Sequence, residues 1–112
     1  MKVPKRIKIG YTDIAIIPME SLEGFANGNY GHFSAPELCI RIITDLKPLV
    51  VMNTLIHEVF HACWFVGGLE DTDEEERVVN TLANVYSQVL RDNPCYSKYI
   101  QDCLNESKRR NS

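Results

Sequence analysis

The hydrophobic and polar positions divide the chain into an amino-terminal half with the pattern of strands and a carboxyl-terminal half with the pattern of helices. Residues 7–19 are rich in β-branched side chains and end around Pro18, so we expect one or two strands there. Glycine and asparagine at 24–31 predict a turn or irregular loop. Residues 33–34 and 38–43 are expected to form a hairpin connected by 35–37. These short connections predict a small antiparallel sheet of about three strands.

A long apolar segment follows the strands and predicts a helix of about twenty residues. The helix is expected to begin near Asp45 or Lys47, with Pro48 in its first turn, where the missing N–H costs no hydrogen bond. Gly67 and Gly68 are expected to end it. Because apolar residues occur nearly all round this helix, we expect the sheet and a second helix to bury most of it.

A second, amphipathic helix is predicted over residues 77–91, with its end at Asn93-Pro94. Acidic side chains crowd residues 70–76, where negative charge favours the amino terminus of a helix. Thr72 and Glu75 have the spacing of a capping box. A short C-terminal helix and a frayed basic tail at 107–112 complete the chain. The predicted fold class is therefore α+β, a small antiparallel sheet on two main helices.

Composition narrows the protein class without changing this fold. A chain of 112 residues, 45% hydrophobic and 24% charged, fits a single domain over 1–112. The net charge is −3 and the only basic cluster is terminal, so we expect no nucleic-acid partner. No segment suggests a signal peptide or approaches the ~20 apolar residues of a membrane span, so we expect a cytoplasmic protein without a membrane partner.

The four cysteines are expected to be reduced thiols in such a compartment. They are Cys39, Cys63, Cys95 and Cys103, and none belongs to a C-x-x-C pair. Cys63 follows an apolar helical run and is expected to be a small core residue.

The candidate chemistry lies in the first helix, where His57, Glu58 and His61 have the order H-E-x-x-H. Positions i and i+4 of a helix lie on one face, so both imidazoles can reach one metal ion. Glu58 projects beside the same ion and can take a proton from a water that the metal activates. Three clustered polar groups in an apolar helix require partners, and a divalent cation such as Zn²⁺ satisfies all three.

The third metal ligand is expected from the acidic start of the second helix. Glu75 is partly engaged by the predicted capping box. Glu76 stands two turns before Ala83, a small residue that allows the first helix to approach closely. We therefore predict Glu76 as the ligand, with Glu75 as the alternative.

These residues resemble the gluzincin metallopeptidases, which carry H-E-x-x-H on one helix and a glutamate ligand on the next. Glu76, Asn80 and Ala83 match the family's spacing, although Asn80 stands where an aspartate usually orients the first histidine. The chain is most similar to the minigluzincins and to short zincin-like proteins encoded by phages and prophages. That second likeness rests on the segments 54–58 and 91–94, and the whole resemblance covers roughly residues 38–94.

The resemblance implies a zinc metallopeptidase in which His57, His61 and Glu76 bind Zn²⁺ and Glu58 is the catalytic base. Its partner would be a peptide or protein substrate, paired with the edge of the strand at 38–43, and the protein would be a monomer or a small homo-oligomer. Candidates for a further group that stabilises the oxyanion are His32, Tyr30 and Tyr86.

Two other functions stay open at this point. One is a zinc-stabilised protein without catalysis, in which Cys39 or His32 would close the fourth coordination position. The other is a host-directed interaction protein on the same fold. An intact Glu58 favours the peptidase, because a purely structural zinc site has no use for it.

Overall fold

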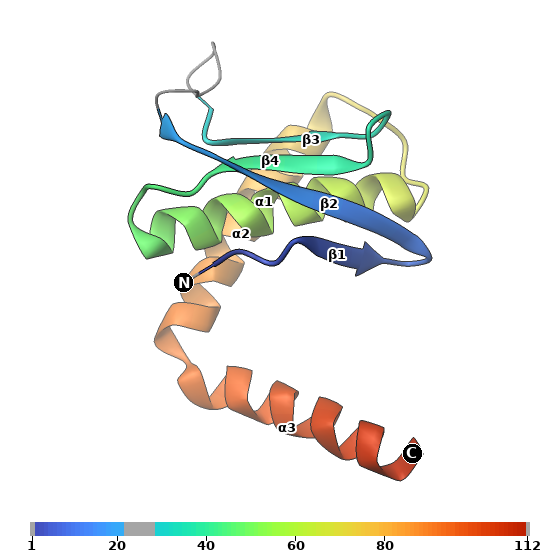
Figure 1. The fold of residues 1–112 in the computed structure, drawn as a ribbon, viewed down its shortest axis with the longest axis vertical. Coiled ribbons are helices and arrows are strands. Elements are labelled where there is room, and N and C mark those ends of the chain that lie inside the picture. The colour runs from blue at the N-terminus through green and yellow to red at the C-terminus, as the bar shows by residue number, and fades with distance from the viewer. Residues whose placement is uncertain (1, 22–28, 112) are drawn as a thin grey trace.

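The computed structural model describes residues 2–21 and 29–111, which form an α+β fold of the predicted class (Figure 1). Part of the turn predicted at 24–31 lies outside the described residues. The strands are β1 (Arg6–Ile9), β2 (Thr12–Met19), β3 (Gly31–Ser34) and β4 (Cys39–Ile43). The helices are α1 (Pro48–Val66), α2 (Glu74–Asp92) and α3 (Pro94–Asn111).

The sheet is mixed, with four strands in the order β1-β2-β4-β3, so the prediction of an all-antiparallel sheet was wrong. β1 and β2 form an antiparallel hairpin, as do β3 and β4. The central pair, β2 and β4, is parallel, with Ala15 opposite Cys39 and Met19 opposite Ile43. The chain leaves the end of β2, forms the outer strand β3 and returns as β4 between them. This path places β4 in the interior of the sheet and leaves β3 at one edge.

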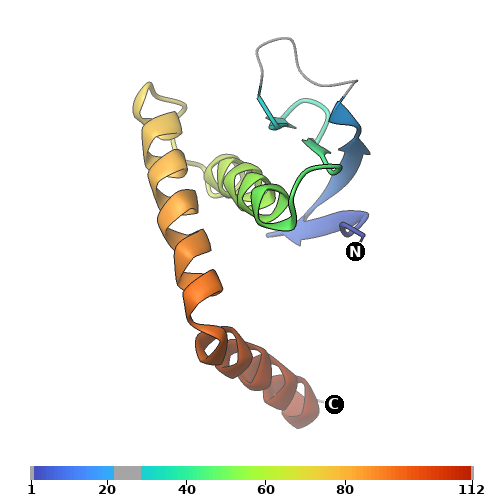
Figure 2. The same cartoon turned by 90° about the vertical axis from the view of Figure 1, so that its left-hand side faces the viewer.

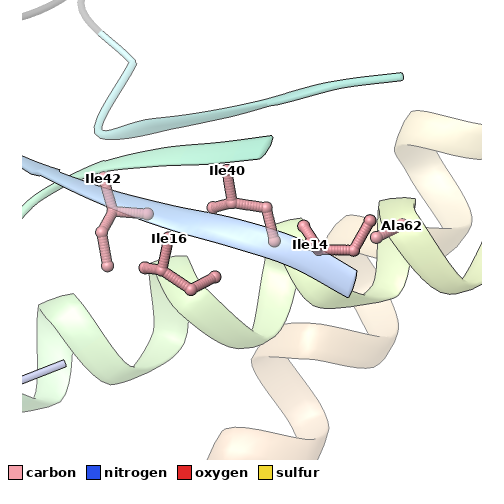
Figure 3. Close-up of a cluster of buried hydrophobic side chains, with 5 residues drawn as sticks. All are labelled: Ile14, Ile16, Ile40, Ile42 and Ala62. Atoms are coloured by element: carbon pink, nitrogen blue, oxygen red, sulfur yellow. The ribbon is translucent and has the colours of Figure 1, made fainter. Parts of the chain in front are cut away.

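One face of the sheet packs on α1 and forms the hydrophobic core (Figure 3). Side chains alternate between the two faces of a strand, so every second residue of β2 and β4 points to the same side. The buried residues of this cluster are Ile14, Ile16, Ile40, Ile42 and Ala62. Burial of apolar area at about 25 cal/mol per Å² is the main force that holds α1 against the sheet.

Helix α1 has the predicted bounds, since it begins with Pro48 after Lys47 and ends where the Gly67 N–H bonds to the carbonyl of Cys63. Gly68 follows with φ of +79°, a conformation that favours glycine. The predicted burial all round was wrong, because the buried residues of α1 are only Thr54, Glu58 and Ala62. α1 lies between the sheet and α2 (Figure 2), and most of its other residues are only partly buried. Cys63 is exposed there and is not a core residue.

By length and composition α1 could also cross a membrane, contrary to the expectation that no segment approaches such a span. This is weak evidence for a membrane segment, because the core helices of many water-soluble domains have the same length and composition. α1 makes its contacts here with the sheet and with α2.

Helix α2 packs across α1, and a side-chain amide joins them. Asn53 of α1 donates to the carbonyl of Ala83, to Asn84 Oδ1 and to Ser87 Oγ, at 3.5, 3.1 and 3.1 Å. Ala83 is small and buried in α2, and it permits α1 to approach closely, as expected from the sequence.

Helix α3 is longer than predicted and includes residues 107–111, most of the segment expected to be a frayed tail. It projects from the end of α2 away from the sheet (Figures 1 and 2). Its first turn touches α2 through a hydrogen bond of 3.1 Å between the hydroxyls of Tyr86 and Tyr96.

Gly31 is required by the close packing of β3 on α1. A Cβ at this position would lie 2.7 Å from Thr54 Cγ2 and 3.2 Å from Glu58 Cγ. We therefore expect Gly31→Ala to lower the free energy of unfolding by about 1–3 kcal/mol, measured by urea denaturation. Thr54→Ser removes the nearest methyl group and keeps the hydroxyl that bonds to the Val50 carbonyl. The double variant should recover part of the loss, whereas strictly additive effects would contradict a Thr54 clash.

Candidate metal centre

Three donor groups from α1 and α2 converge at one point. His57 and His61 lie one turn apart on α1, and their Nε2 atoms are 3.2 Å apart. Glu76, in the first turn of α2, places Oε1 3.0 Å from His57 Nε2 and Oε2 2.9 Å from His61 Nε2. The structure therefore brings together the three predicted ligands, with a donor atom of each within 4.8 Å of the others.

These separations fit the donor set of a zinc ion. Ligand atoms at about 2.0–2.1 Å from a tetrahedral ion are about 3.3 Å from one another. The two Nε2 atoms, 3.2 Å apart, lie close to that value. Glu76 approaches them with different oxygens, Oε1 at 3.0 Å from His57 Nε2 and Oε2 at 2.9 Å from His61 Nε2. Two neutral nitrogens and one carboxylate oxygen are ligands that zinc accepts, so His57, His61 and Glu76 could hold a zinc ion.

Glu75 has a different role from Glu76. Its Oε2 lies 2.5 Å from Nδ1 of His61, on the opposite side of the ring from the converging atoms. A carboxylate on the second ring nitrogen fixes the tautomer and makes Nε2 a better donor to a metal. The predicted capping box is therefore wrong: the Thr72 hydroxyl accepts from the Glu74 N–H, and the Glu75 carboxylate is used on His61. Two adjacent glutamates at 75 and 76 could have indicated one metal ligand and one partner for a ligating histidine. The Thr72–Glu75 spacing instead led us to assign Glu75 to a capping box.

His57 lacks an equivalent partner among the described residues. Asn80, predicted to orient it, lines the same cleft, but no hydrogen bond joins the two side chains in the described structure. Partial burial lowers the pKa of His57, although the nearby Glu76 carboxylate opposes the shift. The lowered pKa favours the neutral imidazole, which is the form that binds metal.

Glu58 lies beside the ligands but on the buried side of α1. Glu58 is 7% exposed, and Gly31 of β3 packs against the Glu58 Cγ atom. Burial raises the pKa of Glu58 to about 7, since loss of water disfavours the charged carboxylate. The charge of His61 and a hydrogen bond from the Phe33 N–H act in the opposite direction. The backbone contacts at Gly31 and Phe33 were not predicted, because they depend on how β3 lies over α1.

The site opens onto a cleft of about 700 Å³ between α1, α2 and the start of β3. His57, Glu58, Glu76 and Asn80 line it together with Tyr30 and Gly31. A smaller hollow of about 220 Å³ lies on the other side of Glu58 and is lined also by His32, His61 and Glu75. Glu58 and Glu76 thus border both openings.

The other predicted site residues are distributed unevenly. Tyr30 lines the larger cleft and His32 lines the smaller hollow, so both stay candidates for a group that stabilises the oxyanion. Tyr86 is turned toward Phe60 and Tyr96 and lies outside the cleft, so it is not an oxyanion group. Cys39 is buried in the sheet beside Arg41, 3.2 Å from its guanidinium, and does not line the metal site. The four cysteines are free thiols.

Comparison of the chain with protein-family models, with curated proteins and with solved structures finds no match in any of the three. The resemblance to gluzincins therefore rests on the motif residues and on their spacing.

Glu75 and Glu76 should differ in their effect on metal binding. We expect Glu76→Ala to abolish stoichiometric zinc binding, because it removes a ligand. Glu75→Gln should keep one zinc per chain with an affinity weaker by about 10–100-fold, the usual effect of losing a partner of a ligating histidine. Competition titration against a chromophoric chelator measures both. Glu74→Ala is the matched control, since Glu74 is exposed and pairs with Arg77; a greater loss in Glu75→Gln than in Glu76→Ala would reverse the assignment.

The raised pKa of Glu58 predicts how the stability of the metal-free protein depends on pH. The folded pKa of about 7 exceeds the unfolded value of about 4.3, so the folded state binds more protons between these values. Stability therefore falls as pH rises from about 4.5 to 7 and levels off above it. We expect Glu58→Gln, measured by urea denaturation in a chelator, to be more stable than wild type at pH 8, by at most about 4 kcal/mol. Equal stability of the variant and the wild type at pH 8 would show that ionisation of Glu58 does not lower the free energy of unfolding.

Proposed function

We propose that this protein is a zinc-dependent metallopeptidase. The observation that carries the proposal is a carboxyl group with a pKa near neutrality, Glu58, buried next to three converging ligand groups and open to a cleft. A purely structural metal site needs the ligands alone. A hydrolytic site also needs a base next to an accessible coordination position, and Glu58 at the cleft supports this proposal.

His57, His61 and Glu76 would hold the ion, while Glu75, bonded to Nδ1 of His61, would orient that ring. A zinc ion bound there supplies Lewis-acid polarisation of a water molecule and of the peptide carbonyl. The lowered pKa of His57 keeps its imidazole neutral and available as a ligand near pH 7.

Glu58 moves the protons of the reaction. Its carboxylate accepts a proton from the attacking water as the water oxygen bonds to the carbonyl carbon. When the C–N bond breaks, the Glu58 carboxyl returns that proton to the leaving amine. In the metal-free protein burial raises the pKa of Glu58 to about 7, so the carboxyl and carboxylate forms are both populated near neutral pH. The contacts with Gly31 and the Phe33 N–H hold the carboxyl in place for each transfer.

The substrate is a peptide or protein segment in extended form. The predicted docking strand, residues 38–43, is wrong, because β4 lies inside the sheet between β2 and β3. β3 is the edge strand and borders the site through Gly31, His32 and Phe33. We propose that the substrate strand approaches along β3 and carries a peptide bond past Glu58. The protein is proposed to act in the cytoplasm, on substrates that include no nucleic acid.

The decisive variant is Glu58→Gln, because glutamine keeps the shape of the side chain but accepts no proton. We expect it to bind zinc at one ion per chain and to lose peptide hydrolysis by at least about 100-fold. Metal content is measured by elemental analysis and hydrolysis by cleavage of a peptide library.

Arg77→Gln is the control, since Arg77 is exposed and pairs with Glu74 away from the ligands. Unchanged hydrolysis in Glu58→Gln would exclude Glu58 as the base. Stoichiometric zinc without hydrolysis in the wild type would favour the zinc-stabilised, non-catalytic protein.

A further inference from the structure

A row of apolar side chains runs along α2 beside its contact with α1 and is partly exposed. It consists of Val78, Leu82, Val85 and Val89, with spacings of four, three and four residues. Leu82 and Val85 are each 55% exposed. Side chains with this spacing form a continuous stripe on one face of a helix, which is the pattern of helices that pack lengthwise on a partner. We call these four residues the α2 stripe.

Helix α3 carries a second stripe with the same spacing. Its residues are Tyr96, Ile100, Cys103 and Ser107, flanked by Tyr99 and Leu104. Tyr99 is 68% and Leu104 53% exposed. The opposite face of α3 carries Lys98, Asp102 and Asn105, so the helix is clearly two-sided. An 18-residue helix with an uncovered apolar face gains stability only when that face is buried.

The two stripes cannot meet within one chain. Asn93 alone separates α2 from α3, whereas two antiparallel helices need a connection of about 2–5 residues. Beyond its first turn, where Tyr96 bonds to Tyr86, α3 diverges from α2 (Figure 2). The α2 stripe is therefore not covered by α3 of the same chain.

We infer that the occupant is α3 of a second copy of this chain, packed antiparallel along α2. The lengths match, since α2 has 19 residues and α3 has 18, or about 28 and 27 Å at 1.5 Å per residue. In the antiparallel direction the basic end of α3, with Lys108 and Arg109, meets the acidic start of α2, which follows Glu70 and Asp71. A parallel arrangement would lose this complementarity.

The antiparallel register pairs the two stripes position by position. With their centres aligned, Leu82 lies opposite Cys103, Val85 opposite Ile100 and Val89 opposite Tyr96. An apolar hollow of about 290 Å³ adjoins the α2 stripe and is lined by Trp64, Leu69, Val78 and Leu82, among others. Leu104 of the second copy, next to Cys103, is placed to fill it. The hollow and the stripe thus form one continuous apolar surface.

A two-fold axis parallel to the bisector of the α2–α3 angle, but displaced from the plane of the two helices, repeats the contact, because it places each α3 over the α2 of the other copy. The α2 stripe lies on the side of α2 opposite Glu76 and Asn80 by helical periodicity. The dimer therefore leaves the metal cleft open, and the inference does not depend on the proposed peptidase function.

The test is the mass of the full chain in solution, measured by sedimentation equilibrium with and without zinc. We expect a dimer in both conditions. Ile100→Asp and Leu82→Asp should each raise the dimer dissociation constant at least about tenfold, while α-helical circular dichroism is retained. Asn105→Asp, on the polar face of α3, is the matched control and should leave the constant unchanged. A monomeric wild type would overturn the inference.

The register is tested with a native thiol. In Leu82→Cys, oxidation should link the introduced thiol of one chain to Cys103 of the other, and Cys103→Ser in the same background should abolish the link. Cross-linking that survives Cys103→Ser would contradict the pairing. A monomer that instead binds vesicles of anionic phospholipid through Ile100 and Leu104 would assign the α3 stripe to a lipid surface and also overturn it.

Discussion

The packing of α1 between the sheet and α2 is the constraint on which the rest of the structure depends. One row of α1, Thr54, Glu58 and Ala62, faces the sheet and is buried, while His57 and His61 lie on the adjacent side toward α2. A helix places neighbouring residues about 100° apart, so adjacent motif residues enter different surroundings. Glu58 thereby loses water and its pKa rises, while His57 and His61 border the two openings beside it.

Charge in the site is arranged by two neighbouring glutamates that point to different atoms. Glu76 is 68% exposed and reaches the Nε2 atoms of both histidines, whereas Glu75 is half-buried and holds Nδ1 of His61. The negative charge on the back of His61 raises its strength as a donor. His57 has a polar neighbour, Asn80, in the cleft but no such carboxylate, so the two imidazoles are not equivalent ligands.

The sheet topology changes how a substrate strand could approach this site. The residues of β2 and β4 were predicted correctly as strands, and their short connections suggested antiparallel neighbours. The segment between β2 and β3 is long enough to carry the chain to the far edge, so β4 pairs in parallel with β2. β3, short and with glycine at its start, becomes the edge strand over Glu58.

The sequence by itself determined the local features: the bounds of α1, set by Pro48 and Gly67, and the metal-ligand spacing of its histidines. These follow from rules that act within a few residues. Only the tertiary structure decided the strand order, the burial of Glu58 under Gly31, and the separate roles of Glu75 and Glu76. Each of these depends on contacts between residues far apart in the chain, which helical and strand periodicity do not encode.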